Sequence, residues 1–240
     1  MDALSLARPL ASSLQRFVLP CRCLLCGVAG NDGLDLCRDC AGELPRNRTC
    51  CARCALPLPE PTALCGQCQR RPPPWDTAWV PFRYAWPLDR LESRFKFSAN
   101  LACGRVLSSL WLREPLPTEL PEWVVPVPLH IGRLRERGYN QARELARPLA
   151  KHLGLTSRFN VLFRQRPTAA QTELGAVARC RNVRGAFITR EHIAWPAHVV
   201  LLDDVMTTGA TLMECARMLK RAGVQRVDVW ALARAPSFKV

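Results

Sequence analysis

The chain has 240 residues, a formal net charge of +14 and an isoelectric point of about 9.7. Because such a charge concentrates polyanions around any fold, nucleic acid and phosphorylated small molecules are the favoured partners. No segment approaches the ~18 to 20 apolar residues that a spanning helix needs, which argues against membrane insertion. Residues 1–20 also lack the pattern of a secretion signal, so a cytoplasmic protein is expected.

The first 20 residues carry apolar side chains at roughly helical spacing, among them Leu4, Leu10, Leu14 and Phe17. Prolines and arginines interrupt this stripe. An apolar stripe on a helix usually faces a protein core. We therefore expect an N-terminal helix over residues 1–20 that packs on the body of the protein, with docking to a membrane or a partner as the alternative.

The cysteines are concentrated near the N-terminus, where the first 75 residues hold 10 of the 13. Eight of these ten form four C-x-x-C pairs. The pairs are Cys23 with Cys26, Cys37 with Cys40, Cys51 with Cys54, and Cys65 with Cys68. A shift of 28 positions carries the first two pairs onto the last two, which indicates an internal repeat of one small structural unit.

Each repeat offers four thiolates to one tetrahedral metal ion. Two residues between paired cysteines allow a tight turn that directs both sulfur atoms to one zinc ion at ~2.3 Å. Disulfides are the main alternative, but the cysteine count is odd, and iron–sulfur ligation does not match the even repeat. A double zinc ribbon over residues 21–74, with two structural zinc ions, is therefore predicted. The repeat favours sequential over crossed pairing of the C-x-x-C pairs.

Residues 75–240 have the periodicity of an α/β domain, and a proline-rich connection over residues 70–75 precedes them. In chain order, the pattern predicts a strand over residues 78–84, one or two helices over 88–112, a strand over 123–127, a helix over 137–153, a strand over 199–202, a helix over 212–221 and a strand over 227–231. The final strand, helix and strand have the order of a parallel sheet covered by helices.

The clearest chemical signal follows the apolar run of residues 199–202, which predicts a central strand buried on both faces. Asp203 and Asp204 end that run. They are followed by Thr207, Thr208, Gly209, Ala210 and Thr211. Backbone N–H groups at the start of a helix favour a phosphate, and the carboxylates can accept hydrogen bonds from ribose hydroxyls. The segment thus predicts a ribose 5-phosphate site, with a plain helix cap after two solvated acids as the alternative.

Residues 199–211 resemble the phosphoribosyl pyrophosphate signature of type I phosphoribosyltransferases, in which an apolar strand leads into Asp-Asp-Val-x-Thr-Thr-Gly-x-Thr. Residues 126–146, residues 162–187 and the CLLCG of residues 23–27 are further similar to the ComF family of competence-type proteins, over nearly the whole chain. The resemblance implies a type I phosphoribosyltransferase-like parallel sheet over residues 75–240, with an N-terminal double zinc ribbon.

The resemblance also implies roles for single residues. Asp203 and Asp204 would contact ribose hydroxyls at the catalytic centre, and the loop of residues 207–211 would hold the 5-phosphate. Arg133 and Arg137 would lie near the pyrophosphate, with a solvated basic turn as the alternative. A mobile loop closing over the site would include Arg164, Arg166, Thr168, Gln171 and Arg179. Mg²⁺ would bridge the diphosphate of the ligand.

Two functions from different classes fit these features. One is transfer or hydrolysis of the phosphoribosyl group of phosphoribosyl pyrophosphate, with an acceptor that no residue identifies. The other is a non-catalytic, regulatory scaffold that binds single-stranded DNA during uptake, together with proteins of the competence machinery, as the ComF resemblance implies. Aromatic residues that could stack on bases are few, and the cluster at residues 75–86 is better explained as linker and core.

Overall fold

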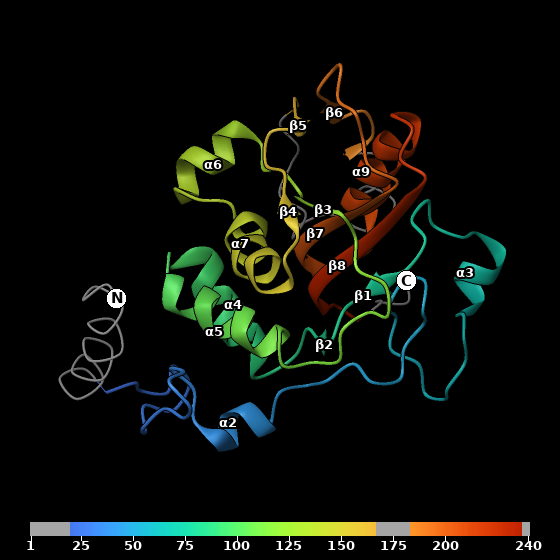
Figure 1. The fold of residues 1–240 in the computed structure, drawn as a ribbon. Helices are drawn as coiled ribbons and strands as arrows, with labels where there is room; N and C mark the ends of the chain where they lie inside the picture. The colour runs from blue at the N-terminus through green and yellow to red at the C-terminus, as the bar shows by residue number, and fades with distance from the viewer. Residues whose placement is uncertain (1–19, 167–182, 237–240) are drawn as a thin grey trace, which may run out of the picture.

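The computed structural model describes residues 20–166 and 183–236. Within these residues a parallel sheet carries helices on both faces, and the two cysteine-rich units lie at its periphery (Figure 1). The helix expected over the first residues of the chain lies outside this range, as do Thr168, Gln171 and Arg179 of the expected mobile loop. None of the helices described is both long and apolar enough to cross a membrane.

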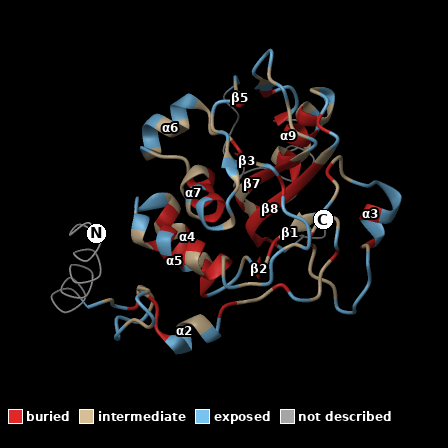
Figure 2. Ribbon diagram, in the orientation of Figure 1, coloured by how far each residue is buried: buried red, intermediate tan, exposed pale blue. Residues whose placement is uncertain are grey.

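The central sheet has the strand order β1-β8-β7-β3-β4, and β2 also pairs with β8. Its strands are β1 (Ala78–Trp79), β2 (Phe82–Arg83), β3 (Trp123–Pro126), β4 (Thr156–Ser157), β7 (His198–Met206) and β8 (Arg226–Arg234). All pairings in it are parallel. The apolar runs of β7 and β8 are buried almost throughout (Figure 2), as expected for central strands with helices on both sides. The predicted α/β sheet is confirmed.

Strand β7 is longer than the apolar run of residues 199–202 predicted. It continues to Met206 because β8 pairs with it past the acidic residues, with Asp203 opposite Ala231 and Met206 opposite Arg234. The prediction that the two aspartates follow the strand was therefore wrong. They lie inside the strand near its carboxyl end, where backbone pairing with β8 fixes the position of Asp203.

The edge strand predicted over residues 78–84 is present in two halves, β1 and β2. Both halves pair with β8 in one register. Val80 and Pro81 interrupt the strand, since proline has no N–H to donate to a ladder. The side chain of Asn47 donates to the carbonyl of Val80 at 3.1 Å, and its backbone N–H donates to the carbonyl of Pro81 at 2.7 Å. The segment between the two cysteine units thus covers this edge of the sheet.

Two hydrophobic cores lie on opposite faces of the sheet. Helices α4 (Leu88–Phe97), α5 (Leu101–Trp111) and α7 (Gln141–Leu153) pack on one face, and α9 (Ala210–Arg221) packs on the other (Figure 1). Alternate residues of β7 serve the two cores: Val200 and Leu202 face the first group of helices, whereas Val199 and Leu201 face α9. This alternation is the period of two expected for a strand.

The helix predicted over residues 137–153 corresponds to α7, which begins only at Gln141, and a separate helix that was not predicted, α6 (Ile131–Arg137), precedes it. Gly138 ends α6 in the left-handed conformation, with φ of +79°, and its N–H bonds the carbonyl of Leu134 at 2.9 Å. The side chain of Asn140 then caps α7 by accepting a hydrogen bond from the N–H of Arg143 at 3.2 Å. The apolar periodicity of α7 extends to the N-terminal side of Gly138, so the sequence predicted the start of this helix a few residues too early.

The cysteine-rich units contain the short helices α2 (Arg38–Gly42) and α3 (Gly66–Arg70). Buried residues of the first unit, including Cys23, Leu36 and Leu44, belong to the core beneath α4 and α5. The second unit contributes Ala55 to the opposite core. Each unit therefore packs on a different face of the sheet. A separate antiparallel pair, β5 (Leu162–Arg164) and β6 (Phe187–Thr189), completes the described strands.

Candidate functional site

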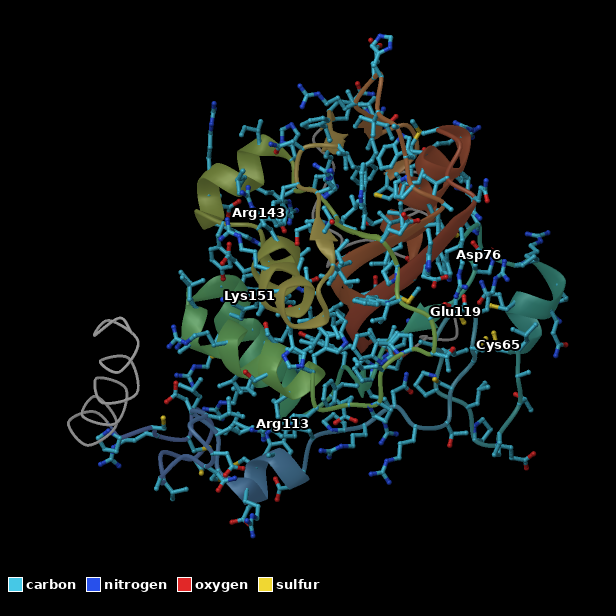
Figure 3. The ribbon with its side chains drawn as sticks, viewed as in Figure 1. Cys65, Asp76, Arg113, Glu119, Arg143 and Lys151 are labelled. Carbon is cyan, nitrogen blue, oxygen red and sulfur yellow. The ribbon has the colours of Figure 1, made fainter. Side chains whose placement is uncertain are left out.

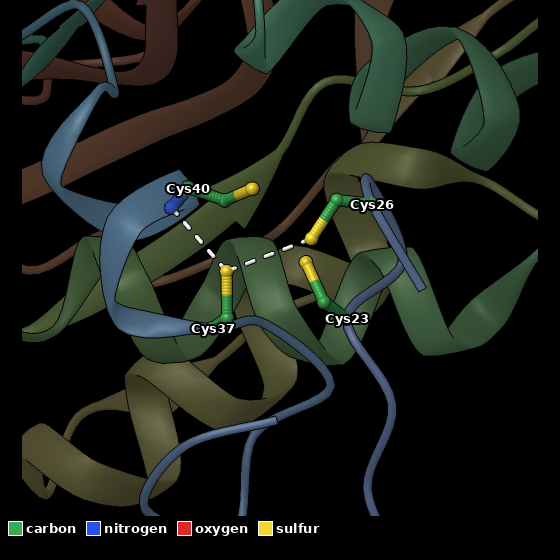
Figure 4. A group of neighbouring side chains, drawn as sticks. All are labelled: Cys23, Cys26, Cys37 and Cys40. Carbon is green, nitrogen blue, oxygen red and sulfur yellow. Dashed lines mark hydrogen bonds between the residues drawn. The ribbon is translucent and has the colours of Figure 1, made fainter. Parts of the chain in front are cut away.

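The eight predicted zinc ligands form two groups of four among the described residues. Cys23, Cys26, Cys37 and Cys40 make one group, and Cys51, Cys54, Cys65 and Cys68 make the other. Within each group all ligand atoms lie within 4.8 Å of one another, and Figure 4 shows the first group converging from two separate turns. The pairing is therefore sequential, as the repeat predicted.

The spacing of the sulfur atoms fits tetrahedral zinc. Corners of a tetrahedron with Zn–S bonds of ~2.3 Å are about 3.8 Å apart. The Sγ atoms of Cys26 and Cys37 are 3.7 Å apart, as are those of Cys54 and Cys65. Burial raises the pKa of Cys23, but hydrogen bonds from the backbone of Cys37 and Cys26 outweigh it and lower the pKa to about 6. These donor sets would hold structural zinc with all four positions filled by protein.

A cavity of about 770 Å³ lies at the carboxyl edge of the sheet. Its wall is formed by α4, by α6 and the start of α7, and by the end of β7 with the loop that follows. The predicted site residues that line it are Asp203, Asp204, Thr207, Thr211, Arg133, Arg137 and Arg164. Figure 3 shows the described side chains on the ribbon of Figure 1. Segments more than 100 residues apart in sequence thus meet at one concave site of ordinary ligand size.

The structure separates Thr208, Gly209 and Ala210 from the residues that line this cavity. Gly209 is the N-cap residue of α9 and has the left-handed conformation, with φ of +73°. The hydroxyl of Thr208 accepts a hydrogen bond from the N–H of Ala210 at 3.3 Å. These three residues shape the loop, whereas Thr207 and Thr211 on either side of them face the cavity.

The predicted arginines come from different elements and have different neighbours. Arg133 and Arg137 are four residues apart on α6, so they share the face that lines it, and Arg137 lies over the ring of Phe97 at 5.4 Å. Arg164 comes from β5 and lies over the ring of Phe187 at 5.5 Å. Burial, followed by the charge of Arg133, lowers the pKa of Arg164. Arg166 is exposed and does not line the cavity.

A lysine that the sequence analysis did not select lies at the centre of the site. The ammonium of Lys96 is 2.5 Å from Oε1 of Glu92 and 3.1 Å from Oδ2 of Asp204. The hydroxyl of Tyr84 donates to Oε2 of Glu92 at 3.3 Å. Glu92 is fully buried, and this burial raises its pKa to about 7 although Lys96 lowers it. The network joins α4 to the acidic pair of β7.

The pKa values of the two aspartates are shifted in opposite directions. Burial and the neighbouring carboxylate of Asp204 raise the pKa of Asp203 well above its ordinary value. Burial would also raise the pKa of Asp204, but the ammonium of Lys96 outweighs it and lowers the pKa. The pair therefore carries one firmly ionised carboxylate and one that retains its proton more readily, the usual outcome for two close acids.

Comparison with known proteins agrees with this architecture. The chain matches the model of the double zinc ribbon domain over residues 14–69 and that of the phosphoribosyl transferase domain over residues 136–239. It is 36% identical to the DNA utilization protein YhgH of Escherichia coli K12, over 90% of this chain and 98% of that protein. The chain belongs to the ComF family.

Two further relatives of this ComF-family chain are named as competence proteins. Competence protein F of Haemophilus influenzae is 36% identical over 70% of this chain and 77% of that protein. Competence protein ComFC of Streptococcus pneumoniae is 27% identical over 64% of this chain and 66% of that protein. The predicted ComF resemblance, the phosphoribosyltransferase fold and the double zinc ribbon are therefore confirmed.

Gln141 is a second residue of the ComF cavity that the sequence analysis missed. Its side chain is only 2% exposed, it lines the cavity, and its Nε2 has no hydrogen-bond partner among the described residues. A buried amide donor without a partner is costly unless a ligand or water satisfies it. The only feature of the sequence that could have indicated Gln141 is its position as the first residue of α7, directly after the cap residue Asn140. Lys96 was even harder to predict from the sequence, because a Glu and a Lys four residues apart usually mark a solvated helix face.

Proposed function

We propose that this chain binds phosphoribosyl pyrophosphate or a related sugar phosphate in the cavity at the end of β7. Asp203 and Asp204 accept hydrogen bonds from the ribose hydroxyls, and the loop of residues 207–211 holds the 5-phosphate. The observation that carries this proposal is the convergence of the acidic pair, of Thr207 and Thr211 of the loop, and of three arginines on one cavity. In parallel sheets ligands bind in this position, at the carboxyl ends of strands.

Charge supports the same assignment. Arg133, Arg137 and Arg164 supply three guanidinium groups to the lining of the same cavity, and guanidinium groups form strong, often paired, hydrogen bonds with phosphates. Lys96 compensates Asp204, so an anion approaching the pair meets less repulsion. Arg179, to which the ComF resemblance gives a role near the pyrophosphate, lies outside the residues that the structure describes.

The acidic pair offers little to a dedicated Mg²⁺ site, since Oδ2 of Asp204 already contacts Lys96. A Mg²⁺ that accompanies the ligand would be held mainly by its diphosphate oxygens, which is the ordinary arrangement for this ion. Bound there, it would supply positive charge to the leaving diphosphate. The protein's own share of that task falls to Arg133, Arg137 and Arg164.

We further propose that the site serves the use or uptake of DNA in the cytoplasm, together with proteins of the competence machinery. The support is in the relatives, which are named competence protein F and DNA utilization protein. An enzyme would consume the bound sugar phosphate, whereas a regulatory protein would only bind it. The test is to incubate the protein with phosphoribosyl pyrophosphate, Mg²⁺ and a panel of nucleobases, and to follow pyrophosphate release. Release that Asp203→Asn abolishes supports catalysis, and binding without release supports a regulatory site.

A second candidate function is the binding of single-stranded DNA, and one observation favours it. A shallow cavity of about 420 Å³ between the second cysteine unit and β2 is lined by Arg46, Arg48 and Arg83, with no acidic residue in its lining. Arg46 pairs with Glu114, whereas Arg48 and Arg83 have no ion-pair partner within the described part of the chain. Such groups suit phosphates of a nucleic-acid backbone. Affinity for single-stranded oligonucleotides should fall with salt, and Arg48→Ala with Arg83→Ala should reduce the slope of log affinity against log salt concentration by about 1.4.

A further inference from the structure

The second zinc ribbon is joined directly to the loop that begins α9, through the side chain of Arg234 at the end of β8. The Nε of Arg234 donates to the carbonyl of Cys54, a zinc ligand, at 3.1 Å. One terminal nitrogen of the same guanidinium donates to the carbonyls of Met206, at 3.0 Å, and of Thr207. Arg234 is only 6% exposed. One buried cation therefore binds both the zinc turn and the backbone of the proposed phosphate loop.

Trp75 makes a second connection between the same two segments. Its indole N–H donates to the carbonyl of Arg53, which lies inside the turn from Cys51 to Cys54, and the side chain is 2% exposed. Its ring lies against Gly209, where an added Cβ would be 3.1 Å from the nearest ring carbon. The left-handed turn at Gly209 is thus in close contact with a side chain that the zinc turn fixes.

The first zinc ribbon provides a matched contrast. An arginine also anchors it, since a terminal nitrogen of Arg94 donates to the carbonyl of Leu24, which lies between Cys23 and Cys26. Arg94 is in α4, and the ribbon packs on the core beneath α4 and α5. Within residues 20–166 and 183–236, no hydrogen bond joins this ribbon to the loop of residues 207–211.

We propose that Arg234 and Trp75 are positioning residues that couple zinc in the second ribbon to sugar-phosphate binding, and that the first ribbon has no such coupling. The inference rests on the proposed function of the β7 site. Zinc holds the turn from Cys51 to Cys54, the turn holds Arg234 and Trp75, and these two fix the direction of the loop's N–H groups. Loss of that zinc therefore lowers affinity for the ligand, and by reciprocity the bound ligand retains that zinc.

The test compares Arg234→Gln with Arg94→Gln, because both substitutions remove an arginine that binds a carbonyl in a zinc turn. Zinc release to a chromogenic chelator is followed with and without saturating phosphoribosyl pyrophosphate. In the wild type the ligand should slow the release of one of two zinc ions at least tenfold. Arg234→Gln should remove this protection and weaken ligand affinity at least tenfold. Arg94→Gln should accelerate release of the other zinc ion and leave both protection and affinity unchanged.

Trp75→Phe provides a milder variant if Arg234→Gln folds poorly, since it keeps the ring and removes only the donor to Arg53. It should weaken protection in the same direction. Equal protection in the wild type and Arg234→Gln, at equal affinity, would overturn the coupling. A wild type that binds no sugar phosphate would instead refute the proposed function. The link between Arg234 and the second zinc turn is tested separately and without ligand, because Arg234→Gln must still accelerate release of one zinc ion, and unchanged release would refute that link.

Discussion

The ammonium of Lys96 lies 3.1 Å from Oδ2 of Asp204, and this contact joins helix α4 to the central strand β7 at the candidate site. The same ammonium contacts Oε1 of the fully buried Glu92 at 2.5 Å. One lysine thus compensates two carboxylates, of which Glu92 is fully buried and Asp204 is largely buried at the edge of the cavity. Such a network is sensitive to the loss of its cation, because the remaining charges cannot easily be solvated.

Replacing Lys96 by methionine should therefore destabilise the protein by about 3–5 kcal/mol, the usual cost of breaking a buried ion pair. Urea unfolding at pH 8 measures the change. Arg147→Met is the control, because Arg147 pairs with Glu144 at the surface and its removal should cost at most about 1 kcal/mol. Adding Glu92→Gln to Lys96→Met should recover part of the loss. If Lys96→Met costs no more than the control, the network is not the buried unit described above.

Asp203→Asn should stabilise the ligand-free protein at pH 8. Burial and Asp204 raise the pKa of Asp203 well above 3.8, so the folded protein retains a proton that the unfolded chain has released. The resulting stability is complete below the unfolded pKa and is lost as pH rises through the folded pKa. Asparagine has no such dependence, so the gain of the variant should be smallest near pH 4 and increase with pH.

Asp76→Asn is the control of opposite sign. Burial would raise the pKa of Asp76, but Lys220 and the N–H of Val227 outweigh it and lower the pKa. Its stabilising effect is present above pH 3.8 and is lost as pH falls through the folded pKa. Asp76→Asn should therefore lose stability at pH 8 and approach the wild type in acid. Parallel pH profiles for the two variants would contradict the assignment for Asp203.

Gly209→Ala should cost more stability than Gly154→Ala, although both glycines are left-handed. Their φ angles are +73° and +69°, so the conformational cost of about 1–2 kcal/mol is shared. At Gly154 an added Cβ meets nothing within 4 Å, whereas at Gly209 it would lie 3.1 Å from Trp75 and 3.3 Å from Met206. Denaturant unfolding of both variants measures the difference. Equal losses would show that Trp75 does not press on the loop.

Metal analysis of the purified protein should return about two zinc ions per chain. Cys40→Ser and Cys68→Ser each remove one ligand from a different group of four, so each variant should lose about one zinc ion. Cys26→Ser combined with Cys40→Ser should also lose only one zinc ion, because both residues belong to one group; if the cysteine pairs were shared across the repeats, this double variant would lose both ions. Iron in place of zinc, read from the same measurement and from visible absorption, would refute the ribbon assignment.

The sequence was sufficient wherever one segment carries the whole signal. The zinc ligands follow from a repeat of C-x-x-C spacing, and the loop of residues 207–211 follows from a contiguous motif. Arg133 and Arg137 were selected from the ComF resemblance, as residues that follow the strand at 123–127, and the structure places them four residues apart on the face of α6 that lines the cavity. The cysteine repeat and the loop motif depend on local geometry alone.

The sequence was insufficient where distant segments meet. Lys96 reaches Asp204 across 108 positions, and Arg234 reaches Cys54 across 180, so neither pair leaves a local pattern. The start of α7 was misplaced because its apolar period continues past Gly138, where one left-handed residue ends the preceding helix. The length of β7 was underestimated because its pairing with β8 continues past the acidic residues, and the apolar pattern of the sequence gives no information on that pairing.

Titration calorimetry of phosphoribosyl pyrophosphate with Mg²⁺ tests most directly whether a sugar phosphate is held between the aspartates and the loop of residues 207–211. The wild type should bind one equivalent, Asp203→Asn with Asp204→Asn should weaken binding at least a hundredfold, and Arg46→Gln, outside this cavity, should bind as the wild type does. Absence of binding heat with the folded, zinc-loaded wild type at several temperatures, or equal affinity in all three proteins, would contradict the account.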